Sequence, residues 1–160
     1  MKLSDEGYEF IKRHEGVIQG IYRDPVGLLT GGIGHLIDPL EKGPQNIRWA
    51  EGHKVCDHQV RDWFDQDVIE VEDAVTRLVV TQLSQKGFDA LVSFTFNVGI
   101  KAFRNSTLLR KLNLGNVEEA AEEFPRWNKS RGKVLPGLVR RRREEKEMFL
   151  EGEVKEFLAC

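Results

Sequence analysis

Three residues near the start of the chain, Glu15, Asp24 and Thr30, have the types that acid and base chemistry on a water molecule needs. Asp24 follows Glu15 by nine positions, and Thr30 follows Asp24 by six. Two carboxyl groups can divide a hydrolytic task, because one stays protonated as the acid while the other stays ionised as the base. A hydroxyl beside them can help to hold the attacking water. The stretch therefore predicts a hydrolytic site.

The elements that must position these residues can be predicted from the surrounding sequence. Ser4 is a good helix N-cap, and the helix that it starts ends at Glu15, where a glycine follows. Residues 24–27, Asp-Pro-Val-Gly, suit a type I turn. Residues 28–30 and 33–37 have the pattern of short strands. We expect a helix end, a turn and a strand of a small antiparallel sheet to carry the three residues.

The rest of the chain reads as mainly helical. Residues 38–56 are irregular, with several prolines and glycines. Apolar residues recur every three or four positions over 57–80, which predicts one long helix, or two with a break near Asp65. Residues 81–160 are predicted to be helical throughout. A run of arginines, Arg140–Arg143, lies on the last of these helices. It suits nucleic acid, but consecutive helix residues point in different directions, so a solvated helix face fits the run equally well.

Charge and cysteine content narrow the classes of protein that fit. Residues 1–80 carry 9 basic and 15 acidic side chains, whereas residues 101–143 carry 12 basic and 4 acidic ones. A basic second half suits an anionic partner, and both cell wall and nucleic acid qualify. Cys56 and Cys160 read as free thiols of a reducing compartment. The N-terminus has no apolar signal region and no stretch is long enough to span a membrane, so we expect synthesis to end in the cytoplasm.

Two other kinds of site are disfavoured. His53, Cys56 and His58 lie close together in the sequence, but they lack the second ligand pair that a zinc site requires. Residues 31–34, Gly-Gly-Ile-Gly, are followed by neither a capped helix nor a lysine, so a phosphate-binding loop is not expected. We predict neither a metal nor a cofactor.

Several motifs, in order and well spaced, resemble one family. Thr30 opens Thr-Gly-Gly-Ile-Gly-His-Leu at the spacing from Glu15 and Asp24 given above. Residues 88–99 read Phe-Asp-Ala-Leu-Val-Ser-Phe-Thr-Phe-Asn-Val-Gly, and residues 132–142 read Gly-Lys-Val-Leu-Pro-Gly-Leu-Val-Arg-Arg-Arg. Together they make the chain, from about residue 5 to about residue 150, resemble the phage-type lysozymes, the endolysin muramidases of glycoside hydrolase family 24.

The resemblance implies a single lysozyme-like α+β domain over 1–160. A small antiparallel sheet lobe (about 15–56) and a larger helical lobe (1–14 and about 80–160) would be joined by a long helix (about 57–80), with the active-site cleft between the lobes. It also implies hydrolysis of the β-1,4 bond between N-acetylmuramic acid and N-acetylglucosamine in peptidoglycan. Glu15 matches the general acid, Asp24 the second carboxylate, and Thr30 the hydroxyl that helps to hold the water, with inversion as the expected outcome.

The same resemblance implies the other residues and the partners. Leu36, Phe96, Asn97 and His35 match positions that line the sugar cleft, although Phe96 equally suits the core and His35 a hydrogen bond within its lobe. Peptidoglycan is the expected partner, without nucleic acid or stable membrane association, and a monomer is the default. The protein would stay in the host cytoplasm until a phage holin released it to the wall, causing lysis of the host.

Several points stay open from the sequence. The segment 39–56 looks longer and more polar than in compact family members, which bears on substrate range. One arginine of the last helix, Arg141, could reach a carboxylate or the substrate. A lytic transglycosylase needs only one carboxyl group, so Asp24 and Thr30 argue against it. A non-catalytic wall-binding module would be expected if the acid or the base were substituted, but Glu15 and Asp24 are both present. A virion-associated lysozyme remains an alternative to a free endolysin.

Overall fold

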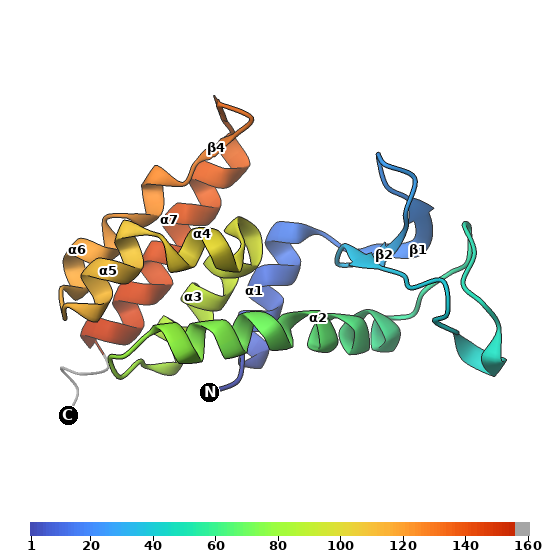
Figure 1. Cartoon of the computed structure of the whole chain (residues 1–160), viewed down its shortest axis with the longest axis horizontal. Coiled ribbons are helices and arrows are strands. Elements are labelled where there is room, and N and C mark those ends of the chain that lie inside the picture. The colour runs from blue at the N-terminus through green and yellow to red at the C-terminus, as the bar shows by residue number, and fades with distance from the viewer. Residues whose placement is uncertain (156–160) are drawn as a thin grey trace. The chain divides into compact units, whose positions relative to one another are not determined.

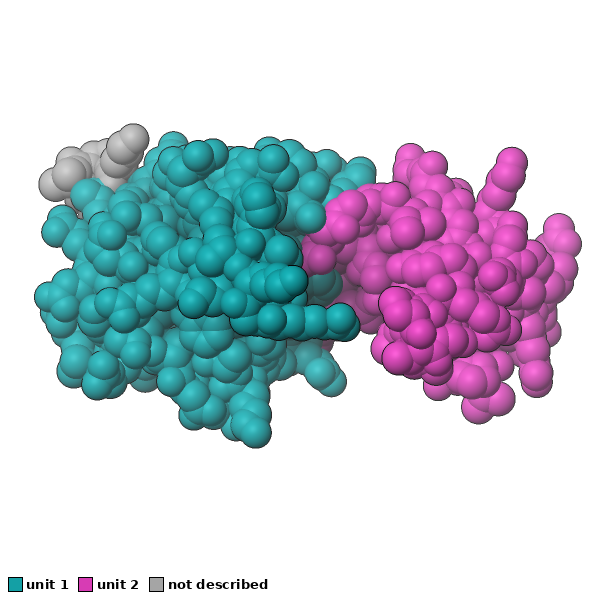
Figure 2. All heavy atoms as spheres, turned by 90° about the horizontal axis from the view of Figure 1, so that it is seen from above, with its two compact units in different colours: residues 1–14, 70–160 teal, residues 15–69 magenta. Residues whose placement is uncertain are grey.

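A computed structural model of the chain describes residues 1–155 (Figure 1). The chain divides into two compact units, coloured separately in Figure 2. Unit 1 comprises residues 1–14 and the chain from Glu70 onward, and unit 2 comprises Glu15–Ile69. Among residues 1–155, no helix combines the length and the apolar character needed to cross a membrane.

Unit 2 is built on a three-stranded antiparallel sheet. Strands β1 (Ile18–Arg23), β2 (Leu29–Gly32) and β3 (His35–Leu36) lie in the order β1-β2-β3. Tyr22 pairs with Thr30, and Thr30 pairs with Leu36, so Thr30 occupies the middle strand. The sheet predicted from the sequence is therefore present, with strand boundaries shifted by one or two residues.

The glycine cluster of β2 allows helix α2 (Asp57–Leu78) to pack closely on the sheet. A Cβ atom on Gly31 would lie 2.9 Å from Ile21 Cδ1 and 3.1 Å from Trp63 Cζ3. Gly32 has φ +61, a conformation that side chains rarely adopt, and it faces Trp63 and Val60 of α2. The glycines thus serve the packing of Trp63, which is 1% exposed. Helix α2 runs without the break near Asp65 that the sequence leaves open.

Unit 1 is mainly helical. Helix α1 begins in this unit and spans Asp5–Glu15, and Gly7 N donates to Ser4 Oγ at 3.0 Å, which confirms the predicted cap. The α-helices that follow α2 are α3 (Gln85–Val98), α4 (Ile100–Arg104), α5 (Thr107–Asn113), α6 (Val117–Ala121) and α7 (Pro136–Leu150). Helix α3 packs against α7, and five phenylalanines form the centre of this core: Phe88, Phe94, Phe103, Phe124 and Phe149.

Three features of unit 1 differ from the sequence-based expectation. Residues 129–134 form a two-stranded hairpin of β4 (Lys129–Ser130) and β5 (Lys133–Val134), in a half of the chain for which the sequence predicts helices and no strands. Asn116 and Glu119 have the sequence spacing of a capping box, but Asn116 precedes α6 without a side-chain capping bond. A π-helical turn, Glu151–Lys155, follows α7. The carboxylate of Glu153 accepts hydrogen bonds from Ser84 N and Ser84 Oγ, both 2.8 Å, and so ties this turn to the start of α3.

Candidate active site

The turn after β1 orients the carboxylate of Asp24. Asp24 Oδ1 accepts hydrogen bonds from Val26 N at 3.0 Å and from Leu28 N at 2.8 Å. The backbone closes the same turn, because Asp24 N donates to Leu28 O and Gly27 N donates to Asp24 O, both at 2.9 Å. Within residues 1–155, the second carboxylate oxygen, Oδ2, accepts no hydrogen bond. One oxygen of Asp24 therefore fixes the side chain, and the other can accept a proton or a hydrogen bond.

Thr30 lies two residues beyond the same turn and is only 3% exposed. Its hydroxyl donates to Leu28 O at 3.1 Å. Since that bond uses the hydroxyl hydrogen, the oxygen keeps its acceptor capacity for a water. Leu28 thus binds Asp24 through its N–H and Thr30 through its carbonyl, and the structure brings these two predicted residues together around one residue.

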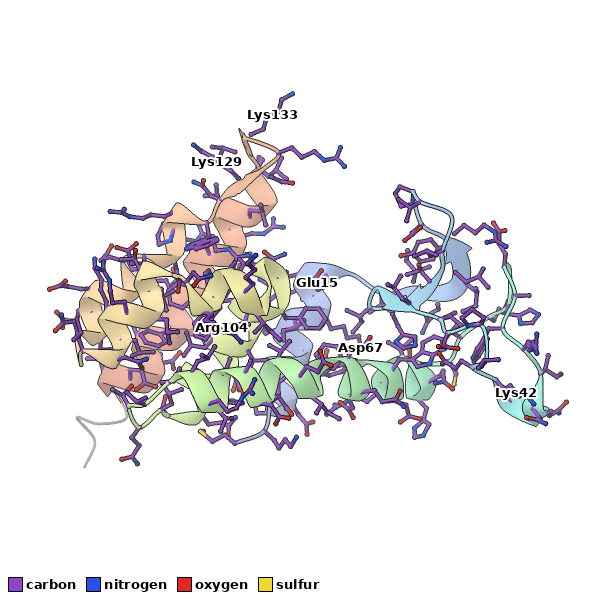
Figure 3. The ribbon with its side chains drawn as sticks, viewed as in Figure 1. Glu15, Lys42, Asp67, Arg104, Lys129 and Lys133 are labelled. Carbon is purple, nitrogen blue, oxygen red and sulfur yellow. The ribbon has the colours of Figure 1, made fainter. Side chains whose placement is uncertain are left out.

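Glu15 is the last residue of α1 and the first residue of unit 2, and its side chain is exposed (Figure 3). Gly16 follows with φ +78, a left-handed conformation typical of the residue after a helix. The sequence correctly predicts this position at the helix end. The catalytic roles of Glu15, Asp24 and Thr30 stay predictions.

His35 is held inside unit 2 by two carboxylates. Its Nδ1 lies 2.9 Å from Asp67 Oδ2, its Nε2 lies 3.1 Å from Glu41 Oε2, and its ring stacks on Trp63 with the ring centroids 4.7 Å apart. Glu41 also accepts a hydrogen bond from Trp63 Nε1. The expected hydrogen bonding of His35 within its lobe is present. A contact between His35 and a sugar stays a prediction.

The charge of His35 should make stability depend on pH. Burial lowers the pKa of His35, but hydrogen bonds and negative charges from Asp67 and Glu41 outweigh it, so the pKa lies above the ordinary 6.5. A group whose pKa is raised by folding stabilises the fold below its unfolded pKa, and this stabilisation is lost as the pH rises through the folded pKa. We expect the melting temperature to fall as the pH rises above about 6.5, and to fall less in His35→Gln.

Thermal unfolding followed by circular dichroism from about pH 5 to pH 9 measures this effect. His58→Gln is the matched control, because His58 is exposed and, among residues 1–155, pairs only with Asp62 at 3.4 Å, one turn along α2. The same pH dependence in His35→Gln and in the parent protein would contradict the assignment.

The other predicted substrate-binding residues lie on separate elements. Leu36 of β3 is 56% exposed. Phe96 is half-buried near the end of α3, and the neighbouring Asn97 is exposed, with its Oδ1 accepting a hydrogen bond from Arg142 Nη2. Asn97 also lines a hollow of about 410 Å³ in unit 1, together with Val98, Trp127, Lys129, Ser130, Leu135 and Leu138. A lining that combines apolar side chains with an amide, a hydroxyl and an ammonium group suits a sugar N-acetyl group or a peptide.

A buried ionic network in unit 1 corrects the interpretation of the arginine run. Arg141 and Arg142 are 3% and 0% exposed, so neither lies on a solvated face, and Arg141 holds a carboxylate, as the sequence left open. Glu145 accepts from Arg141 Nε at 3.0 Å, from Arg142 Nη1 at 2.7 Å and from Ser93 Oγ at 2.7 Å. The signal that could have revealed it is the spacing of both arginines from Glu145, three and four positions along one helix.

Comparison with solved structures defines the class of fold. A mutant of P22 lysozyme aligns with a TM-score of 0.82 and 35% identity, covering 94% of this chain and 99% of that one. The muramidase domain of SpmX from Asticaccaulis excentricus aligns with a TM-score of 0.80 and 38% identity, covering 93% and 97%. The chain therefore has a lysozyme-like α+β fold, as the sequence predicts.

The family follows from the sequence comparisons. A family model described as phage lysozyme matches residues 12–145, and the chain belongs to that family. The endolysin of Salmonella phage P22 is 39% identical over 150 residues, which are 94% of this chain and 99% of the relative. The endolysin of Bacillus phage B103 is 39% identical over 157 residues, 97% of this chain, but the match spans only 56% of that longer relative.

Proposed function

We propose that the chain is a muramidase that hydrolyses the β-1,4 bond between N-acetylmuramic acid and N-acetylglucosamine in peptidoglycan. The observation that carries this proposal is the arrangement around Leu28, which holds the carboxylate of Asp24 and the hydroxyl of Thr30. Glu15 ends the preceding helix, and the phage lysozyme match includes all three residues. The names of the relatives, endolysin and lysozyme, agree with this activity.

The proposed mechanism assigns one task to each residue. Glu15 protonates the glycosidic oxygen as the bond to the muramic acid breaks. A water held by Thr30 Oγ1 and by Asp24 attacks the opposite face of the sugar, and Asp24 Oδ2 takes its proton. This single displacement inverts the configuration at the reacting carbon, and it requires the two carboxyl groups to lie about 6.5–9.5 Å apart so that the water fits between the base and the sugar.

The same proposal assigns the residues that bind the substrate and the place where the protein acts. Leu36 and Phe96 offer apolar surface to the faces of sugar rings, and Asn97 offers its amide NH₂ to an N-acetyl oxygen. The chain works as one lysozyme domain. In a phage infection it would be a monomeric endolysin that remains in the host cytoplasm until a holin allows it to reach the wall and lyse the cell.

Thr30 gives a specific prediction, because its role depends on one hydroxyl. Thr30→Val keeps the shape of the side chain but removes the oxygen that holds water, so we expect the rate of wall hydrolysis to fall by roughly 10–100-fold. Thr30→Ser keeps the oxygen and should retain most of the activity. The initial rate of turbidity loss of a wall suspension measures both variants. Equal activity in Thr30→Val and Thr30→Ser would contradict the proposed role of Thr30 in holding the water.

The activity itself is tested on purified peptidoglycan. We expect the suspension to clear and new reducing ends to accumulate on muramic acid, identified by borohydride reduction followed by acid hydrolysis and sugar analysis. New ends on glucosamine would show cleavage of the other glycosidic bond. Anhydromuramic ends, without new reducing ends, would show a lytic transglycosylase, and binding without cleavage would show a wall-binding module.

A further inference from the structure

Residues 126–143 form the most basic segment of the chain, with eight arginines and lysines and no acidic residue. Arg141 and Arg142 of this segment are buried and paired with Glu145. The hairpin β4–β5 carries three others, Lys129, Arg131 and Lys133, all exposed. The buried arginines are thus accounted for by the fold, whereas the hairpin cations are not.

The hairpin geometry spreads these three cations around a narrow projection. Arg131 and Gly132 form its tip with φ +50 and φ +77, the left-handed conformations that two-residue hairpin turns use. Lys129 pairs with Val134, and Ser130 pairs with Lys133. Since residues of a cross-strand pair lie on the same face, Lys129 and Lys133 point to opposite faces, with Arg131 at the turn between them. Figure 3 shows both lysines extending from this hairpin.

These side chains have no ion pair or hydrogen bond with any side chain or backbone group of residues 1–155. Three other cations of unit 1 have partners: the exposed Lys2 binds Glu72, and the half-buried Lys86 and Lys146 bind Glu151 and Glu122, each at 2.8 Å. The nearest acidic positions in the sequence are Glu123 and Glu144. Glu123 pairs with Lys111 at 2.7 Å, and Glu144 pairs with Arg13 at 3.0 Å. The hairpin therefore presents a positive charge that the described part of the protein does not neutralise.

We propose that the hairpin β4–β5 is a docking element for the carboxylate groups of the peptide stems of peptidoglycan. This inference rests on the proposed function, since it takes the same polymer as the partner. The peptide stems end and branch in carboxylates at short intervals along the glycan, so the wall is a polyanion. A cluster of unpaired cations raises the rate of association with a polyanion, and added salt weakens this attraction. The hairpin would hold the enzyme on the wall between cleavage events.

The chemistry of the hairpin favours carboxylates over two other anionic partners. No aromatic residue lies within 129–134 to stack on nucleic acid bases, and Val134 is its one apolar side chain, which is little for insertion into a lipid surface. Lys129 and Ser130 also line the 410 Å³ hollow with Trp127 and Leu135, so a peptide on the hairpin can continue against an apolar wall.

The test compares two triple variants with the same loss of charge. Lys129→Gln, Arg131→Gln and Lys133→Gln together neutralise the hairpin. The matched control neutralises Lys101, Arg104 and Arg110 of α4 and α5, which are exposed cations of the same unit. Figure 3 labels Arg104. Both are combined with Glu15→Gln so that the wall stays intact. Cosedimentation with purified sacculi in about 50 mM salt gives the affinity, and circular dichroism confirms that each variant is folded.

Each cation near an anionic surface strengthens binding by about fivefold. The affinity of the hairpin variant for sacculi should therefore fall at least tenfold, whereas that of the control variant should change by less than about threefold. Carbodiimide and glycinamide amidate the carboxyl groups of sacculi. The parent should bind these amidated sacculi as weakly as the hairpin variant binds untreated sacculi.

Three results would overturn the proposal. Equal losses in both triple variants would show a general charge effect. An unchanged hairpin variant would show that the hairpin does not dock. Undiminished binding of the parent to amidated sacculi would assign the hairpin another ligand, which anionic vesicles and single-stranded DNA would identify. Binding to sacculi does not require cleavage. A protein that docks through the hairpin but does not cleave the wall would therefore contradict the proposed function and leave the docking proposal intact.

Discussion

Replacing Glu15 by glutamine is expected to lower the rate of peptidoglycan hydrolysis by about 10²–10⁴-fold, because glutamine cannot donate the proton that the leaving oxygen requires. The substitution is nearly isosteric and lies at the exposed end of α1, so the melting temperature should change little. The rate is measured as the turbidity loss of chloroform-treated Gram-negative cells and, in parallel, as reducing ends released from purified walls.

Glu9→Gln is the matched control, since Glu9 is an exposed glutamate of the same helix and pairs only weakly with Lys12, at 3.7 Å. This variant should hydrolyse walls at the rate of the parent protein. If Glu15→Gln clears walls as fast as Glu9→Gln does, Glu15 is not the acid, and another carboxyl group must protonate the leaving oxygen.

Replacing Glu145 by alanine is expected to destabilise the protein by about 3–5 kcal/mol, because it removes the carboxylate that pairs with the buried charges of both Arg141 and Arg142. Burial raises the pKa of Glu145, and the positive charges of Arg142 and Arg141 act against that rise. Ser93 Oγ would lose its acceptor as well. The melting temperature should therefore fall by roughly 6–20 °C, as measured by differential scanning calorimetry.

Glu147→Ala provides the comparison for this loss. Glu147 lies on the same helix, is 69% exposed in its side chain, and approaches Arg143 only to 3.9 Å. Surface pairs of this kind contribute about 0–1 kcal/mol, so the melting temperature should fall by no more than a few degrees. Similar losses in the two variants would mean that the network around Glu145 stabilises the fold no more than a surface pair does.

The sequence predicted local structure best where a few adjacent residues determine it. Ser4 caps α1, Glu15 ends that helix, and the Asp-Pro-Val-Gly stretch forms the turn that carries Asp24. Each of these features depends on capping, helix termination or turn chemistry within a few residues. The predicted positions of Asp24 and Thr30 around one turn follow from the same local rules.

Features that depend on contacts distant in sequence were not predicted. Glu41 lies in the irregular segment 38–56, and only the folded chain shows that it binds His35 and Trp63. The hairpin at 129–134 has no alternation of apolar and polar residues, because its side chains are all exposed and no core selects them. Arg142 reads as a surface residue until Glu145 and Phe94 are placed around it.

The central claim is that a water held by Thr30 and Asp24 attacks the sugar directly while Glu15 protonates the leaving oxygen. Proton NMR of the first products released from soluble peptidoglycan fragments, recorded before the anomers equilibrate, tests it most directly. Direct attack on a β bond predicts that the α anomer of the new reducing end appears first. Initial formation of the β anomer, or of an anhydro ring without a reducing end, would contradict the claim.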